Sequence, residues 1–160
     1  MPGIKLICVG KLKERYYIDA SNEYIKRLSP LCKINVVELS EARLPQSYSA
    51  AERSASLKEE ARHIKKHIEN ELFVVAMCIE GNEVTSESFA ELIKLRFDSG
   101  SPNICFVVGG SQGLHDEIKA SADLLMSMSR MTLPHHLARV VLLEQLYRAF
   151  MINMGKKYHK

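Results

Sequence analysis

The sequence contains no long hydrophobic run. Its longest apolar stretches, such as residues 72–79, fall far short of the ~20 residues that a membrane-spanning helix requires. The first residues also lack the apolar stretch that a secretory signal places before its cleavage site. We therefore expect a cytoplasmic protein that does not engage a membrane.

Cysteine is sparse, and its spacing excludes the common metal motifs. Cys8, Cys32, Cys78 and Cys105 are too far apart in the sequence to form a metal knuckle. Three of them lie within apolar, strand-like segments, where a reduced cysteine acts as a small core residue. We expect no disulfide framework and no metal.

Two familiar glycine-rich phosphate sites are also missing. The stretch FVVGGSQGL (106–114) has glycines at 109, 110 and 113. The dinucleotide fingerprint needs glycines at i, i+2 and i+5, and a P-loop needs Lys-Ser/Thr after its last glycine, where this chain has Leu114. What remains is a glycine turn at the end of a buried strand.

The segments that are present alternate between strand and helix patterns. Strands are predicted at 4–9, 33–39, 72–79, 103–108 and 124–128, and helices at 13–28, 51–70, 85–97, 114–122 and 135–154. The segment 40–50 has turn composition and is expected to be a surface loop. Because the length suits one domain, residues 1–160 are expected to form a single three-layer α/β domain around a mostly parallel sheet.

Three loops follow strands of this sheet and could share one pocket. They are MCIEGN (77–82), the glycine turn, and SMSRMTLP (127–134). Open α/β sheets bind ligands at the carboxyl edge of their strands. Met126, Met128 and Met131 flank the third loop and could either fill core gaps or line an adaptable apolar pocket.

The last predicted helix is apolar around most of its circumference, which is typical of a buried helix. The helix could be buried within its own domain or against a second subunit, and we favour a homodimer.

The charge distribution along the chain also leaves two alternatives open. Residues 124–143 contain no acidic side chain, so the basic ends of the chain either form a face for a polyanion or are simply scattered and solvated.

Three histidines outside the last helix receive a structural interpretation. His63 and His67 stand four residues apart on a charged helix, where a solvated face is expected because no third metal ligand is apparent. His115 follows the glycine turn and is interpreted as a helix-start residue.

Several motifs taken together resemble one family closely. They are IKLICVGKLKERY at the start, VVGGSQGL (107–114), SRMTLPHHLARVVLLEQLYRAF (129–150) and the terminal KYHK (157–160). The chain resembles, over nearly its whole length, the RlmH family of SPOUT, or α/β-knot, methyltransferases, which methylate N3 of a pseudouridine in bacterial 23S rRNA. The resemblance implies a C-terminal trefoil knot, a homodimer, and the assembled ribosome as partner.

The resemblance also implies S-adenosylmethionine as cofactor and a set of residues that bind it. Carried over by motif, these cofactor-binding residues are Met77, Gly109, Met128, Ser129, Arg130, Met131, Thr132 and Leu133. The family typically has leucine where Met77 stands, which preserves an apolar contact. A sulfonium donor is already a strong electrophile, so no metal is required.

Three further residues are candidates for a role in catalysis. A cation such as Arg139 would stabilise the charge left when the N3 proton departs. His159 could act as general base, and Tyr158 could stack on the pseudouridine base or hydrogen-bond it. The alternative for the tail is a frayed terminus. Other expectations kept open are a different SPOUT reaction, such as ribose 2′-O or guanosine N1 methylation of tRNA, and a non-catalytic ribosome-binding factor.

Overall fold

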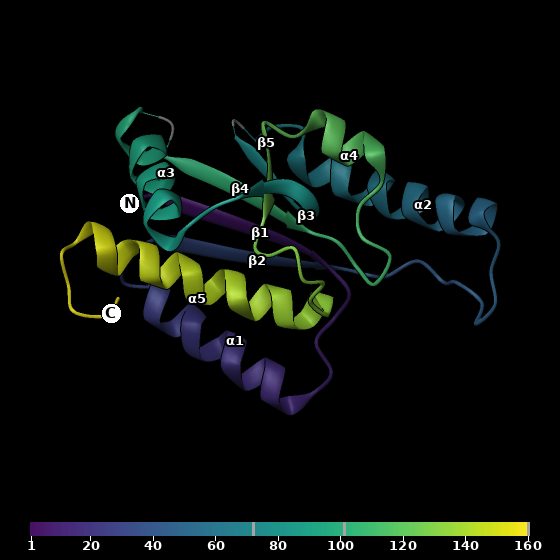
Figure 1. The fold of residues 1–160 in the computed structure, drawn as a ribbon, viewed down its shortest axis with the longest axis horizontal. Coiled ribbons are helices and arrows are strands. Elements are labelled where there is room, and N and C mark those ends of the chain that lie inside the picture. Colours follow the sequence, from purple (N-terminus) through teal and green to yellow (C-terminus); the bar gives the residue numbers. More distant parts are fainter. Residues whose placement is uncertain (72, 101, 160) are drawn as a thin grey trace.

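A computed structural model describes residues 1–71, 73–100 and 102–159 of the chain (Figure 1). It has five strands and five helices within these residues, in the order that the sequence patterns predict. They are β1 (Gly3–Val9), α1 (Arg15–Leu28), β2 (Lys33–Leu39), α2 (Ala50–Ile68), β3 (Val74–Glu83), α3 (Ser86–Asp98), β4 (Asn103–Val108), α4 (Asp116–Ser121), β5 (Leu124–Ser127) and α5 (His135–Asn153).

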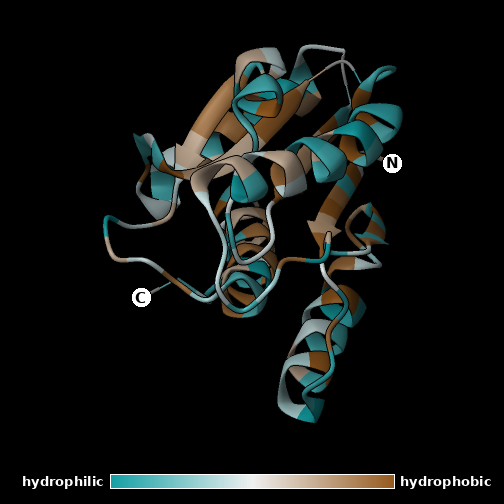
Figure 2. Ribbon diagram, turned by 90° about the vertical axis from the view of Figure 1, so that its right-hand side faces the viewer, coloured by the Kyte–Doolittle hydropathy of each residue, from teal (hydrophilic) through white to brown (hydrophobic). Residues whose placement is uncertain are grey.

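The strands form one parallel sheet in the order β2-β1-β4-β3-β5. Side chains of β1 alternate between its two faces: Leu6 and Cys8 belong to one buried cluster, Ile7 and Val9 to the other. The first cluster packs against α1, α3 and α5, and the second against α2 and α4. Figure 2 shows the strands as strongly hydrophobic elements, as expected for a sheet covered on both faces. The predicted three-layer α/β architecture is therefore confirmed.

Helix boundaries follow local capping chemistry. Thr85 caps α3, because its hydroxyl accepts from the Ser88 N–H at 3.0 Å while the Ser88 hydroxyl accepts from the Thr85 N–H at 2.9 Å. Pro134 immediately precedes α5, and Gly155, with φ of +64°, follows its end. The segment 40–49 is a loop, also as predicted, and the predicted strand start at Leu72 lies outside the described residues.

Strand β3 extends beyond its predicted end because it pairs with β5 twice. Val75, Ala76 and Met77 pair with β5, residues 78–81 leave the ladder, and Asn82 and Glu83 rejoin it. A Cβ on Gly81 would lie 2.6 Å from the Met126 backbone nitrogen, so only glycine allows this approach.

The chain then crosses the sheet to begin α5. From β5 at one edge, residues 128–134 run past the ends of β3 and β4 to the start of α5, where Nη2 of Arg139 donates to the Gly10 carbonyl after β1 at 2.6 Å. The trefoil threading implied by the resemblance stays a prediction.

In the part of the chain that the structure describes, no helix combines the length and hydropathy needed to cross a membrane.

Candidate functional site

A cavity of about 740 Å³ opens at the carboxyl ends of β3, β4 and β5. The three loops that the sequence suggested as one pocket do line it together. The bulge after Met77 forms one wall, the glycine turn a second, and residues 126–134 a third, while Ala138 adds the start of α5. The volume lies within the range of small-molecule and cofactor sites.

The glycine turn is shaped by close contacts within the protein. The Gly113 N–H donates to the Gly110 carbonyl at 3.1 Å, and Gly113 has φ of +81°. A Cβ on Gly109 would meet the Gly113 carbonyl carbon at 2.6 Å. On Gly110, a Cβ would lie 2.7 Å from Oε1 of Glu41. The turn therefore needs glycine at 109, where backbone atoms occupy the space that a side chain would fill. At 110 that space is taken by the end of the Glu41 side chain.

The third wall is held by short hydrogen bonds of its own. The buried Ser127 hydroxyl donates to the Ser129 carbonyl at 2.9 Å, and the Ser129 hydroxyl accepts from the Met131 N–H at 3.0 Å. The Met131 side chain is 78% exposed at the cavity mouth. A flexible thioether there can adapt to a ligand surface.

Seven of the eight predicted cofactor residues line this cavity. They are Met77, Gly109, Met128, Ser129, Met131, Thr132 and Leu133. Arg130 does not line it, because its side chain extends to an ion pair with Glu83, at 2.7 Å. Sequence reasoning missed Arg53 from α2 and the Lys119–Glu80 ion pair, which also line the cavity and carry its charges.

Arg139 lies outside the cavity and is almost fully buried. Its side chain is 3% exposed, with one guanidinium nitrogen 2.5 Å from Glu38 and another 2.6 Å from the Gly10 carbonyl. Burial opposes ionisation of Glu38, but the hydrogen bonds from Arg139 and from the Leu12 N–H, together with the positive charges of Arg139 and Lys11, hold the Glu38 pKa below its usual range. In this structure Arg139 ties the start of α5 to the ends of β1 and β2.

Tyr158 packs against its own subunit. Its ring lies edge-on to Tyr147 with centroids 4.9 Å apart, and the Arg148 guanidinium lies 4.8 Å from its centroid. The hydroxyl donates to Glu144 at 3.2 Å. Burial, together with neighbouring Tyr24 and Glu144, raises the pKa of Tyr158 to about 12, so the phenol is neutral at physiological pH.

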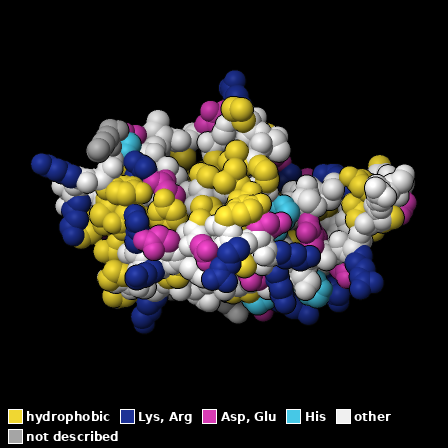
Figure 3. Space-filling view, turned by 90° about the horizontal axis from the view of Figure 1, so that it is seen from below, with side chains coloured by type: hydrophobic (Ala, Val, Ile, Leu, Met, Phe, Trp, Pro, Cys, Tyr) yellow, Lys and Arg dark blue, Asp and Glu magenta, His cyan; other side chains and the backbone are white. Residues whose placement is uncertain are grey.

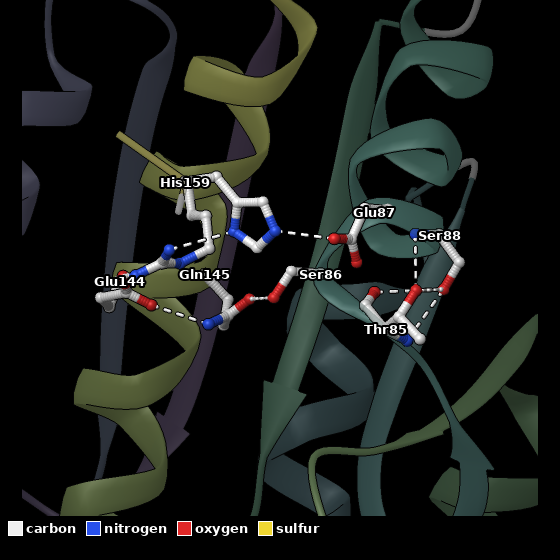
Figure 4. A network of polar contacts seen from close by, with 8 residues as sticks. Thr85, Ser86, Glu87, Ser88, Glu144, Gln145 and His159 are labelled. Carbon is white, nitrogen blue, oxygen red and sulfur yellow. Dashed lines mark hydrogen bonds and ion pairs between the residues drawn. The ribbon is translucent and has the colours of Figure 1, made fainter. Parts of the chain in front are cut away.

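His159 bridges α5 and α3 (Figure 4). Its Nε2 lies 2.7 Å from Glu87, and its Nδ1 lies 3.2 Å from an Arg148 nitrogen. Ser86 and Gln145 link the same two helices through a hydrogen bond of 2.7 Å. The tail is thus docked on its own chain, and neither Tyr158 nor His159 lines the cavity.

Among residues 1–71, 73–100 and 102–159, no group of three or more His, Cys, Asp or Glu side chains is placed to hold a metal ion. The four cysteines are free thiols. Burial raises the pKa of Cys8 and of Cys105 to about 12 and that of Cys32 to about 11, so these thiols are protonated. Cys78 lies at the cavity wall, where burial also raises its pKa.

The fold and the cavity define an α/β protein with a cavity of cofactor size at the carboxyl edge of a parallel sheet. Comparison with known proteins narrows this class. The family described as "Predicted SPOUT methyltransferase" matches residues 3–159, so the chain belongs to the SPOUT methyltransferase family.

Curated relatives match along nearly the whole chain. "Ribosomal RNA large subunit methyltransferase H" of Streptococcus pyogenes serotype M12 is 50% identical over 157 residues, which cover 98% of this chain and 99% of the relative. The protein of the same name from Streptococcus equi subsp. zooepidemicus is 49% identical over the same share of each chain.

Solved structures share the fold at low sequence identity. A probable methyltransferase from Bordetella pertussis Tohama I superposes with a TM-score of 0.59 at 14% identity, covering 92% of this chain and 96% of that one. A probable methylase family protein from Haemophilus influenzae gives 0.57 at 15% identity, covering 98% and 70%. These similarities support the fold alone.

Proposed function

We propose that the chain transfers a methyl group from S-adenosylmethionine to N3 of a pseudouridine in a stem-loop of 23S rRNA within the assembled ribosome. The observation that carries this proposal is the near-complete match, at 50% identity, to relatives named as methyltransferases of large-subunit ribosomal RNA. The position and composition of the cavity support it.

The cavity has the properties that this cofactor needs. Met77, Met128 and Leu133 offer apolar contact, and the glycine turn exposes backbone polar groups beside them. When bound, S-adenosylmethionine supplies an activated methyl group on a sulfonium. The protein has to hold donor and acceptor in line and exclude water, which is how positioning lowers a barrier without a metal.

The remaining chemical task is removal of the N3 proton. His159 is proposed as the general base because imidazole is the side chain most often used for proton transfer near neutral pH. Tyr158 is proposed to stack on the pseudouridine ring or to hydrogen-bond it. In the structure both are docked on α3 and α5, so this role requires the tail to reach a substrate site near a subunit boundary. Arg139 is proposed to act electrostatically from the start of α5.

A homodimer is part of the proposal. Leu137, Val140 and Val141 on α5 are only half-buried in the single chain. Figure 3, which views the molecule from below Figure 1, shows hydrophobic side chains gathered in patches among basic and acidic ones on that face. Such patches are typical of protein interfaces, and a two-fold dimer is the commonest closed assembly.

Calorimetry with S-adenosylmethionine and radiolabelled methyl transfer to ribosomes test the proposal together. Binding with transfer to 23S rRNA is expected. Absence of cofactor binding would favour a non-catalytic ribosome-binding factor, and transfer to tRNA instead would favour a different SPOUT reaction. His159→Gln should lose transfer while it keeps cofactor affinity, with His63→Gln on α2 as the control.

A further inference from the structure

The loop between β2 and α2 places one carboxylate against the glycine turn. The Ser111 N–H and the Ser111 hydroxyl both donate to Oε1 of Glu41, at 2.8 and 2.7 Å. The missing side chain of Gly110 makes this approach possible. Burial opposes ionisation of Glu41, but the two bonds from Ser111 outweigh it and keep the pKa of this carboxyl below its usual range.

The other oxygen of the same carboxylate faces the start of α5. Oε2 of Glu41 lies 3.9 Å from Nε2 of His135, a residue that lines the cavity. Burial and neighbouring His136 lower the pKa of His135, so the contact is between a carboxylate and a neutral imidazole at physiological pH. Glu41 therefore stands between two walls of the cavity, the glycine turn and the start of α5.

Helix α2, which follows the loop that carries Glu41, holds the glycine turn at a second point. Arg53, near the start of α2, donates through Nε to the Gln112 side chain and through Nη2 to the Gln112 carbonyl, both at 2.9 Å. Ser111 and Gln112 are thus tethered in succession by residues that do not belong to the three cavity loops. Hydrogen bonds to charged groups contribute more than neutral ones, and fixed loops bind ligands at a lower entropic cost.

We propose that Glu41 is a positioning residue for the cofactor: its carboxylate holds the glycine turn through Ser111, beside the start of α5, and so preorganises the cavity. Glu41 acts through Ser111, which lines the cavity. The inference rests on the proposed function, since it takes S-adenosylmethionine as the ligand of this cavity.

Three variants of the full-length protein test the proposal by calorimetric titration with S-adenosylmethionine. Glu41→Ala removes both acceptor bonds and should weaken cofactor affinity about tenfold. Glu41→Gln has a side chain of the same length and keeps an acceptor oxygen for Ser111. Its affinity for S-adenosylmethionine should stay within about threefold of that of the unmodified protein. Glu59→Ala, which changes an exposed carboxylate on α2, is the matched control and should bind as the unmodified protein does.

Two further readouts separate positioning from a general loss of stability. In Glu41→Ala, the KM for S-adenosylmethionine should rise while kcat at saturating cofactor is retained. Because Glu41 acts through Ser111, the affinity losses of Glu41→Ala and Ser111→Ala should be less than additive in the double variant.

Unchanged affinity in Glu41→Ala, or a Glu41→Gln variant as weak as Glu41→Ala, would overturn the inference. Its failure is distinct from failure of the proposed function. An unmodified chain that binds the cofactor but methylates no ribosome would contradict the proposed acceptor and leave the Glu41 comparison intact. An unmodified chain that binds no S-adenosylmethionine would overturn both.

Discussion

Replacement of Gly109 by alanine should damage the cavity without unfolding the protein. The new Cβ would clash with the Gly113 carbonyl oxygen and lie 2.6 Å from its carbon, whereas ordinary contact begins at 3.4 Å, so the turn must open by at least about 0.8 Å. A displacement of about 1 Å in a positioning element costs up to about 100-fold in reaction rate, and we expect a comparable loss of cofactor affinity, between about 10- and 100-fold. Gly109 itself has no positive φ, and the effect therefore comes from crowding alone.

Alanine substitutions at two other glycines distinguish the effect of crowding from the effect of backbone strain. Gly113 and Gly100 have φ of +81° and +80°, and at either position a Cβ would have no neighbouring atom within 4 Å. Alanine at either site should lower the free energy of unfolding by about 1 kcal/mol through left-handed strain, with little effect at Gly100 on cofactor affinity. Calorimetric titration and urea unfolding of the three variants measure both quantities. Normal cofactor affinity in Gly109→Ala would show that crowding at the turn does not shape the cavity, as would an equal loss in Gly100→Ala.

Three other perturbations have outcomes set by burial. Leu146→Ala should lower the free energy of unfolding by about 2–5 kcal/mol, because Leu146 is fully buried in the core, and a loss below about 1 kcal/mol in urea would contradict that packing. Arg139→Met should cost up to about 3 kcal/mol by leaving Glu38 without its partner, and an unchanged unfolding midpoint would show that the pair contributes nothing. Cys8 and Cys105 ionise near pH 12 when folded but near about 8.5 when unfolded, so stability should fall as pH rises through this window. Alkaline urea titrations check this, and substitution of either thiol by alanine should flatten the slope.

Local patterns were sufficient to predict the elements of the fold. The apolar runs of β3 and β4 and the helical spacing on α2 each depend on residues that are neighbours in sequence, and the capping role of Thr85 depends on a residue three positions away. The three loops of the cavity were also predictable, because parallel strands place their carboxyl ends at one edge.

The polar contacts that shape the site were not predictable in this way. Arg139 reaches Glu38 across 101 positions, Ser111 reaches Glu41 across 70, and His159 reaches Glu87 across 72. Turn composition in the β2–α2 loop carries no signal that one of its carboxylates will meet a glycine turn. The bulge at residues 78–81 was missed for a related reason, since it depends on how closely β5 approaches Gly81.

Nucleoside analysis of 23S rRNA identifies the acceptor and the position of the methyl group directly. Ribosomes from a strain that lacks this protein can be incubated with the purified chain and S-adenosylmethionine, and the 23S rRNA then digested for nucleoside mass spectrometry. The account predicts one N3-methylated pseudouridine that is absent without the protein and absent with His159→Gln. Ribosomes whose 23S rRNA gains no methyl group under these conditions would contradict it.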